Sequence, residues 1–334
     1  MTYHFSGIDE AGYGPMLGPL VVGMTTLRST EPMTPATPWK KLAPVVRHHS
    51  SRSKQAQRAI AVADSKRLHR PATGDLTGLE EGVLAFIAAE RGHLGAPAEP
   101  PKTFLELIDH LTAGRSQYLV DYPWYRDADL DLPVSASPLT LAGKTRKLER
   151  ALERANISVT EVRAIPLEVL EFNAAIEQHG TKGDVNAWAI GRFLSWLWRH
   201  PERTHAQAWS DRLGGRQRYG PFLAPLFPGT RFQVLEQDRA SQAYRIEERD
   251  GDRTLEIHFE KEGEDKSFPT ALASMTAKYV RELHMRLFNR WWIERIPDLK
   301  KTAGYVQDGR RFLADIEPHR EKNGVSMAPL VRHR

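Results

Sequence analysis

The chain has 334 residues, and the 40% that are apolar suffice for a sizeable core. It contains no cysteine, which excludes a disulfide framework, thiolate metal sites and a cysteine nucleophile, and which fits a reducing, cytoplasmic location. The sequence shows neither a signal-peptide pattern nor an apolar run long enough to span a membrane. The net charge of +5 favours polyanionic partners, although solubility alone explains so modest an excess slightly better.

Apolar periodicity predicts strands interspersed with helices along the whole chain. In chain order, we predict a strand at 3–8, a strand at 20–27, a short apolar stretch at 59–62, helices at 79–91, 103–111 and 144–154, a strand at 157–169, helices at 172–179 and 185–198, a strand at 206–209, alternating strands at 231–260 and a long helix at 271–292. Hairpins together with crossovers are typical of a mixed sheet flanked by helices, an α/β fold.

Two regions depart from this pattern. Residues 95–140 have little periodicity but carry Tyr122, Trp124 and Tyr125, which indicates an insertion with a small core of its own rather than a linker. Alternatively, these aromatic side chains stack on nucleic-acid bases. Residues 236–262 alternate around an Asp-Gly turn and predict an antiparallel hairpin.

The stretch from Gly7 to Gly23 carries the strongest chemical signal. Adjacent acids, Asp9 and Glu10, follow a short strand and precede a turn rich in glycine and proline. Carboxylates at the end of a strand are poor core residues but good ligands for hard cations. Taken alone, they serve equally well as turn-capping residues.

This opening resembles the first motif of the type 2 ribonucleases H, the ribonuclease HII family. Further elements of that family appear in the same order, and they cover residues 5–93, 145–235 and 263–312. They are Asp64-Ser65-Lys66, the apolar strand that ends at Asp211, Lys266-Ser267, the Ala-Ser-x-x-Ala-Lys-x-x-Arg-x helix from Ala273 to Glu282, and Gly304-Tyr305.

The resemblance implies a ribonuclease H-like domain over residues 1–312, with the insertion at 95–140, the extra hairpin at 236–262 and a C-terminal tail at 313–334. It implies a monomeric endonuclease that hydrolyses RNA in RNA–DNA duplexes and leaves 3′-hydroxyl and 5′-phosphate ends. Catalysis would use a two-metal Mg²⁺ or Mn²⁺ site, in which several carboxylates must converge from different elements. The implied metal-holding and catalytic residues are Asp9, Glu10, Asp211 and Glu282.

Nucleic-acid contacts are carried over in the same way. The implied residues are Gly12, Tyr13, Gly14, Lys66, Lys266 and Tyr305, and we add Arg212 and Arg216 as candidate phosphate ligands beside Asp211. Each of these residues also has a simpler interpretation. The lysines can be solvated surface residues, the arginines can be surface charges, and Tyr305 can be an ordinary packing residue. Asp64 is predicted to act in a turn or substrate loop, and Asp184 to cap the helix at 185–198.

Two departures from the family pattern leave other functions open. Glu282 stands where the family helix ends in Asp, and Tyr13 stands where the family has Arg between two glycines. One alternative is therefore a nucleic-acid-binding protein on the same fold with weak or no nuclease activity. Another is a related nuclease that acts on DNA or on a structured junction, because a fold does not fix a function.

Overall fold

The structure is a computed structural model, and it describes residues 2–48, 58–69, 73–126, 128–214 and 216–333. Its strands are β1 (Tyr3–Ala11), β2 (Leu20–Ser29), β3 (Val46–Arg47), β4 (Ile60–Ala61), β5 (Ile157–Leu167), β6 (His205–Asp211), β7 (Arg231–Gln237), β8 (Ser241–Glu247) and β9 (Thr254–Glu260). The positions agree with the strands predicted from periodicity to within a few residues.

The helices lie between and after these strands. They are α1 (Thr37–Lys41), α3 (Ser65–Leu68), α4 (Thr77–His93), α5 (Phe104–Leu111), α6 (Pro123–Arg126), α7 (Pro138–Ala155), α8 (Val169–His179), α9 (Lys182–Arg199), α10 (Gly220–Leu223), α11 (Gly263–Lys266), α12 (Phe268–Ile293) and α13 (Val306–Arg320). Short 3-10 helices occur at Gln117–Asp121, Ala224–Leu226 and Glu321–Asn323. In the described part of the chain, no helix has the length and apolar character needed to cross a membrane.

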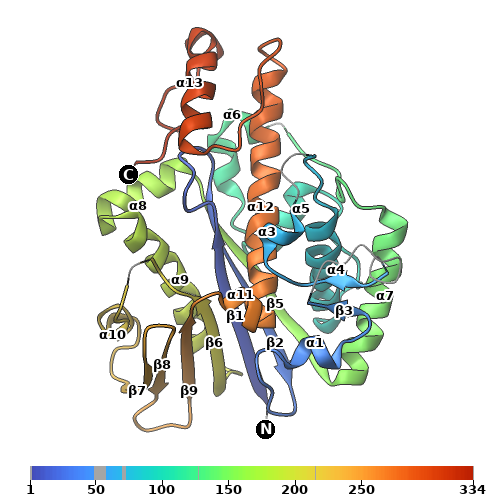
Figure 1. The fold of residues 1–334 in the computed structure, drawn as a ribbon, viewed down its shortest axis with the longest axis vertical. Coiled ribbons are helices and arrows are strands. Elements are labelled where there is room, and N and C mark those ends of the chain that lie inside the picture. The colour runs from blue at the N-terminus through green and yellow to red at the C-terminus, as the bar shows by residue number, and fades with distance from the viewer. Residues whose placement is uncertain (1, 49–57, 70–72, 127, 215, 334) are drawn as a thin grey trace.

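The main sheet has seven strands in the order β5-β2-β1-β6-β9-β8-β7. Strand β1 runs antiparallel to β2 and parallel to β6, while β6 runs parallel to β9. Helices cover both faces, with α12 lying across one of them (Figure 1). This arrangement confirms the mixed, helix-flanked sheet that the sequence predicts.

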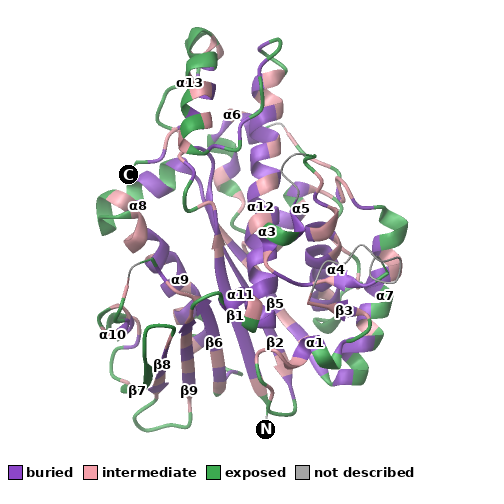
Figure 2. Cartoon of the chain, in the orientation of Figure 1, coloured by how far each residue is buried: buried purple, intermediate pink, exposed green. Residues whose placement is uncertain are grey.

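The sheet separates two hydrophobic cores, because successive residues of a strand face opposite sides. In β2, Val21 and Leu27 belong to the core beneath α12 and α4, whereas Val22 and Met24 belong to the core beneath α9. Figure 2 shows buried residues along the sheet and along α12, with exposed residues toward the outer helices and turns. The ends of the central strands are thereby held between two packed layers.

Three predicted regions differ in detail from their observed structure. The hairpin of β8 and β9 is present, but β9 also pairs with β6 and is therefore an inner strand of the sheet. The boundary expected at residue 312 falls inside α13. The insertion does not form a core of its own: Trp124 packs edge-on against Phe288 of α12, at a ring-centroid distance of 5.0 Å, and joins the main core.

Glycines allow α12 to lie directly on the sheet. A Cβ placed on Gly7 would come within 2.0 Å of the backbone nitrogen of Thr270, and one on Gly23 within 2.4 Å of the carbonyl oxygen of Ala273. A larger residue at either position would push the helix away from β1 and β2. This close approach sets Ser274 of α12 against Asp9 of β1.

Candidate active site

Asp9 and Asp211 lie side by side near the carboxyl ends of two neighbouring inner strands, β1 and β6. The parallel pairing of β1 with β6 places Ile8 opposite Ser210, so the next residues of the two strands are the two aspartates. Strands paired in this way are about 4.8 Å apart, and residues in register face the same side. Asp211 is in turn paired with Glu260 of β9. The carboxyl ends of three parallel strands therefore bring acids to one place.

Glu10 and Glu264 complete a cluster with these aspartates, which we call the carboxylate cluster: Asp9, Glu10, Asp211 and Glu264. Burial and the Glu10 carboxylate raise the pKa of Asp9 well above its usual value, while a hydrogen bond with the Ser274 side chain opposes the shift. Burial also raises the pKa of Glu10, opposed by a hydrogen bond from the Asn186 amide and reinforced by Asp211. Such mutual repulsion is expected where carboxylates share one site without a cation.

Glu264 is the member of this cluster that the sequence reasoning missed. It lies on α11, directly after β9, and it is only 9% exposed. Burial raises its pKa, and the charges of Asp211 and Asp64 raise it further. Its Oε2 atom is buried and has no hydrogen-bond partner among the described residues. A buried carboxylate oxygen without a partner is costly unless a cation or donor occupies the site.

Lys66 places a positive charge over the cluster. Burial opposes its charged form, but the nearby carboxylates of Asp64, Glu264, Asp9 and Asp211 raise its pKa overall. The Asp64 side chain accepts a 2.9 Å hydrogen bond from the Lys66 backbone N–H and so caps α3, the turn role expected for it. The lysine predicted to contact nucleic acid thus lies beside the acids.

Glu282 lies away from the cluster. It is eight residues beyond Ser274 on α12, a rise of about 12 Å along the helix. Its carboxylate forms a 2.6 Å ion pair with Lys278 and lies 3.7 Å from the Nε2 atom of His69. Unlike Glu264, it is absent from the charges that shift the pKa values of Asp9 and Glu10. The structure therefore gathers three of the four predicted acids and replaces the fourth with Glu264.

The glycine-rich turn between β1 and β2 is held by a buried arginine. Arg281, the neighbour of Glu282, donates hydrogen bonds to the carbonyl oxygens of Pro19 at 2.5 Å and Leu17 at 3.2 Å. Gly12 has a φ of +89°, and a Cβ there would lie 2.6 Å from the Pro19 carbonyl oxygen. Only glycine fits this combination of left-handed backbone and close packing.

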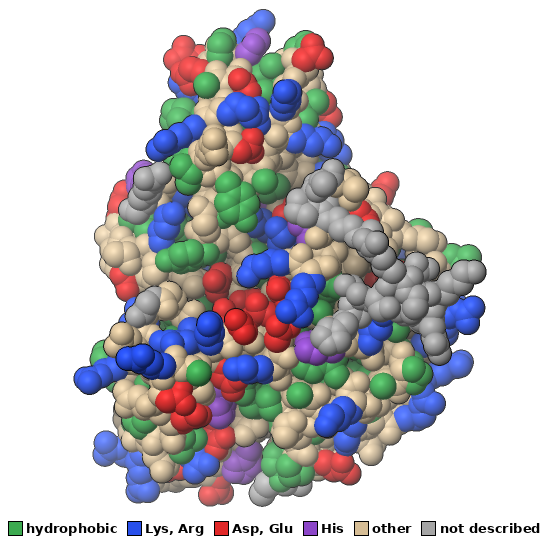
Figure 3. Space-filling model, in the orientation of Figure 1, with side chains coloured by type: hydrophobic (Ala, Val, Ile, Leu, Met, Phe, Trp, Pro, Cys, Tyr) green, Lys and Arg blue, Asp and Glu red, His purple; other side chains and the backbone are tan. Residues whose placement is uncertain are grey.

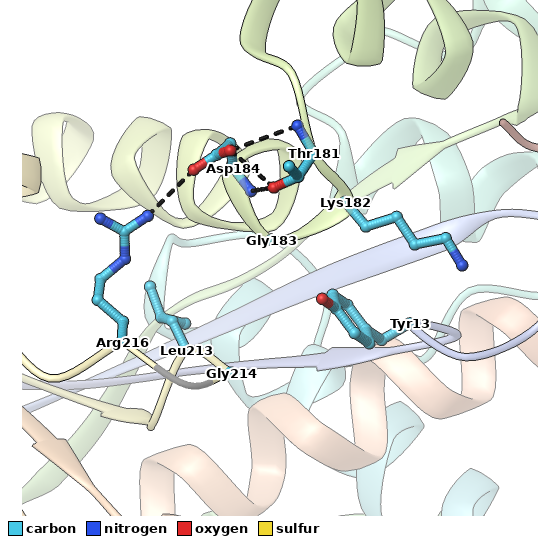
Figure 4. Close-up of a pocket in the computed structure, with 8 residues that line it drawn as sticks. All are labelled: Tyr13, Thr181, Lys182, Gly183, Asp184, Leu213, Gly214 and Arg216. Carbon is cyan, nitrogen blue, oxygen red and sulfur yellow. Dashed lines mark hydrogen bonds and ion pairs between the residues drawn. The ribbon is translucent and has the colours of Figure 1, made fainter. Parts of the chain in front are cut away.

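A cleft of about 550 Å³ opens beside this turn (Figure 4). Tyr13, 40% exposed, lines one side, and Lys182 and Gly183 at the start of α9 line another. Asp184 forms a capping box with Thr181, so Thr181 is the N-cap and the predicted Asp184 is the third helical residue. The cleft offers a lysine and an aromatic face, and the aromatic residue, Tyr13, is three residues after Glu10 in the chain.

The other residues predicted to contact nucleic acid, Arg212, Arg216 and Lys266, already interact with groups of the protein. Arg216 forms a 3.2 Å ion pair with Asp184, and Arg212 donates a 3.0 Å hydrogen bond to the Arg216 carbonyl oxygen and a second to that of Arg239. Both guanidinium groups therefore have partners within the protein. Lys266 is half-exposed and lies 3.6 Å from Glu260.

Tyr305, by contrast, is exposed and lies next to the glycine-rich turn. It is 56% exposed at the start of α13, and a Cβ on Gly14 would lie 3.6 Å from its ring. The late Gly-Tyr element thus meets the first motif, as a shared binding surface requires.

Acidic side chains gather near the middle of the face drawn in Figure 3, over α11 and the ends of β1 and β6, with basic side chains around them. No group of three His, Asp or Glu side chains within the described ranges has the geometry of a formed metal site. The donor chemistry nevertheless suits Mg²⁺ or Mn²⁺, which prefer carboxylate oxygens. The unpartnered oxygen of Glu264 and the mutual repulsion of the acids point the same way.

Comparisons with known proteins find similarity at the level of structure. No protein-family model matches the sequence, and neither does any curated protein. Similar solved structures include the PCNA:RNase HII complex from Archaeoglobus fulgidus (14% identity, TM-score 0.41, covering 99% of this chain and 94% of that one). Others are ribonuclease H2 from Pyrococcus horikoshii OT3 (16%, 0.44, 98% and 92%) and Bst-RNase HIII in complex with Mn²⁺ (14%, 0.40, 99% and 66%). The roles assigned to individual residues rest on the geometry described above.

Proposed function

We propose that this protein is a metal-dependent endonuclease of the type 2 ribonuclease H class that cleaves RNA in RNA–DNA duplexes. The observation that carries the proposal is the convergence of Asp9, Asp211 and Glu264 from β1, β6 and α11, with Glu10 beside them. The ordered motifs of the sequence support it, because Asp9 and Glu10 of the first motif, Lys66 of the second and Asp211 of the third lie in or beside this cluster. Monomeric state and cytoplasmic location stay predictions from the sequence.

The four carboxylates would hold two divalent cations, Mg²⁺ or Mn²⁺. When bound, such a pair lowers the pKa of a water molecule and stabilises the developing charge on the leaving oxygen. The acids at the strand ends are fixed by the sheet, so their positions are set before substrate arrives. The Ser274 side chain beside Asp9 and the Asn186 side chain beside Glu10 favour the charged forms of these two carboxylates.

The reaction is the attack of water on phosphorus with loss of the 3′-oxygen. The new P–O bond forms as the P–O3′ bond breaks, which leaves a 5′-phosphate and a 3′-hydroxyl group. Lys66, above the acids, is placed to bind a phosphate oxygen of the strand being cut. The backbone of Gly12 and Gly14 allows close approach to the ribose, whose 2′-hydroxyl distinguishes RNA from DNA.

Binding without cleavage is the main alternative, and two departures from the family pattern prompt it. Glu282 prompted that alternative, but its side chain pairs with Lys278 and is separate from the carboxylate cluster. The other departure, Tyr13 in place of arginine, concerns the binding of substrate rather than the metal-holding acids. A nuclease that prefers DNA would share the same acids and is distinguished only by its substrate.

The proposal is tested with labelled duplexes that carry one ribonucleotide, or a run of four, within DNA, beside all-DNA and all-RNA duplexes. We expect cleavage at the ribonucleotides in Mg²⁺ or Mn²⁺, and its loss in Asp9→Asn. Salt-sensitive binding with no cleavage in either metal would favour the binding protein. Faster cleavage of the all-DNA duplex would favour the other nuclease.

A further inference from the structure

A second pocket, of about 350 Å³, lies at the β5 edge of the sheet and is separate from the carboxylate cluster. Its walls come from β5, from the loop after α5 in the insertion, and from α8 and α9. None of the four clustered acids lines it. Its volume lies within the range of about 300–1,000 Å³ that is usual for small-molecule sites.

Three arginines line this pocket, and two of them, Arg115 and Arg192, face a single carboxylate, that of Glu171. Arg163 is balanced, since it donates a 2.6 Å hydrogen bond to the buried carboxylate of Glu90. Within the described ranges, Arg115 and Arg192 form no ion pair shorter than 4 Å, and Glu171 is the single acid on the pocket wall. Two guanidinium groups against one carboxylate leave the pocket with one uncompensated positive charge, although the Arg192 guanidinium also lies 5.2 Å from the centre of the Trp188 ring.

Arg115 and Arg192 are close enough to repel each other. Burial lowers the pKa of Arg192, and the charge of Arg115 lowers it further, while the Glu171 carboxylate opposes the shift. The two arginines come from different parts of the chain, one from the insertion and one from α9. Like charges brought together in this way lower their energy when an anion binds between them.

The rest of the pocket wall is apolar and contains a fixed aromatic ring. Trp196 is 49% exposed, unusual for so large an apolar side chain, and its indole N–H donates a 2.9 Å hydrogen bond to Glu161. Phe193 and Leu167 lie behind it. A ring whose orientation is already fixed can stack on a flat ligand with little loss of rotamer entropy.

Addition of a peptide strand along β5 is disfavoured, although this strand is at the edge of the sheet. Pro166 has no backbone N–H to donate, and the Val162 carbonyl oxygen already accepts a 2.8 Å hydrogen bond from Arg163. Both features block edge pairing. Recognition at this edge therefore falls to the side chains of the pocket.

We propose that this pocket binds a small organic anion that carries a flat ring, with its phosphate or carboxylate between Arg115 and Arg192 and its ring against Trp196. This site goes beyond the nuclease proposed above and does not depend on it. Phosphate and carboxylate groups both present oxygen atoms to guanidinium donors. AMP therefore serves as the test compound with a phosphate and a ring, and benzoate as the one with a carboxylate and a ring.

Isothermal titration of the full-length protein, in metal-free buffer of low ionic strength, tests the proposal. We expect saturable binding of AMP or benzoate at one site per chain, and binding of inorganic phosphate weaker by about tenfold or more, because it lacks a ring. Arg115→Gln and Arg192→Gln should each weaken binding by about tenfold. Trp196→Leu should weaken binding of the ring compounds and leave that of phosphate unchanged.

Arg231→Gln is the matched control, since Arg231 is exposed on β7 at the opposite edge of the sheet and should leave binding unchanged. Arg115 is on an exposed loop, so its variant tests the site even if Arg192→Gln unfolds the protein. Failure of both AMP and benzoate to bind at millimolar concentration would overturn the proposal. Equal affinity in wild type and Arg115→Gln, or phosphate bound as tightly as AMP, would do the same.

Discussion

The guanidinium of Arg332 donates a 2.6 Å hydrogen bond to the carbonyl oxygen of Gly12, 320 residues earlier in the chain. A second bond reaches the Pro15 carbonyl, and the guanidinium carbon lies 4.9 Å from the centre of the Phe172 ring. The C-terminal segment thus reaches the glycine-rich turn beside the carboxylate cluster. Together with Arg281 of α12, it fixes a turn that would otherwise have few backbone partners.

Arg332→Ala should loosen this turn. Two buried carbonyl groups would lose their donor, which we expect to lower the free energy of unfolding by about 1–3 kcal/mol. Urea unfolding monitored by circular dichroism measures this loss. In cleavage assays, KM for the duplex should rise more than kcat falls, because the acids stay in place. An unchanged stability together with an unchanged KM would show that the C-terminal segment does not support the turn.

Glu264 and Glu282 provide the sharpest test of the site. Glu264→Gln should reduce cleavage by about 100-fold or more, since even the outer partners of metal ligands are worth about 10–100-fold. Glu282→Gln should stay within about threefold of wild type, because it removes contacts with Lys278 and His69 outside the carboxylate cluster, and a helical pair four residues apart is worth about 0.3–0.5 kcal/mol. Single-turnover rates in Mg²⁺ measure both. The reverse order of effects would return Glu282 to the catalytic set.

The sequence predicted the architecture well and the fourth acid poorly, for one physical reason. Alternating apolar residues mark β9 as a strand, yet they do not reveal that it pairs with β6 rather than only with β8. Once β9 is placed beside β6, an acid directly after it must lie near Asp211. The available signal was an apolar strand that ends in acids, at Asp9, at Asp211 and in the stretch from Glu260 to Glu264, but this pattern does not single out Glu264 among those acids.

The insertion and the C-terminal segment show the same limit. Tyr122, Trp124 and Tyr125 signalled burial correctly, and at about 2% exposure they are too enclosed to stack on bases. Their packing partners are on α12, more than 150 residues away, which periodicity within the insertion does not encode. Arg332 carries no local signal at all, because its role depends on a contact with the opposite end of the chain.

Stability should depend on pH through Glu168, a carboxyl group buried beneath α12. Burial is the main cause that raises its pKa from 4.5 to about 7, although its hydrogen bond with Tyr125 opposes the shift. The folded protein therefore binds a proton that the unfolded chain releases, and stability is lost as pH rises from about 4.5 to 7. The loss is roughly 3 kcal/mol, at about 1.4 kcal/mol for each pH unit.

His284 lies 3.9 Å from Glu168 and acts in the opposite direction. Burial lowers its pKa from 6.5 to about 4, so its contribution to stability is complete above pH 6.5 and is lost as pH falls toward 4. Glu168→Gln removes the glutamate effect and leaves that of His284, while the other titrating groups, such as Asp9 and Glu10, contribute equally to both proteins. Thermal unfolding of this variant should show Tm rising from pH 5 to 7 more steeply than in wild type. Parallel curves would exclude Glu168 as the titrating group.

Tyr13 should affect the binding of the duplex rather than the rate of its cleavage. Its exposed ring lines the cleft with Lys182, and Tyr13 follows Glu10 of the carboxylate cluster by three residues. Stacking on an aromatic side chain is worth about 1–3 kcal/mol per base, so Tyr13→Ala should raise KM by about 5–100-fold with kcat nearly unchanged.

Tyr13→Phe keeps the ring and should retain most of the affinity, whereas Tyr13→Arg exchanges stacking for a phosphate contact and should make binding more dependent on salt. Initial rates on the single-ribonucleotide and four-ribonucleotide duplexes, measured at two salt concentrations, separate these effects. Equal KM for Tyr13→Ala and wild type would mean that the ring does not touch the substrate.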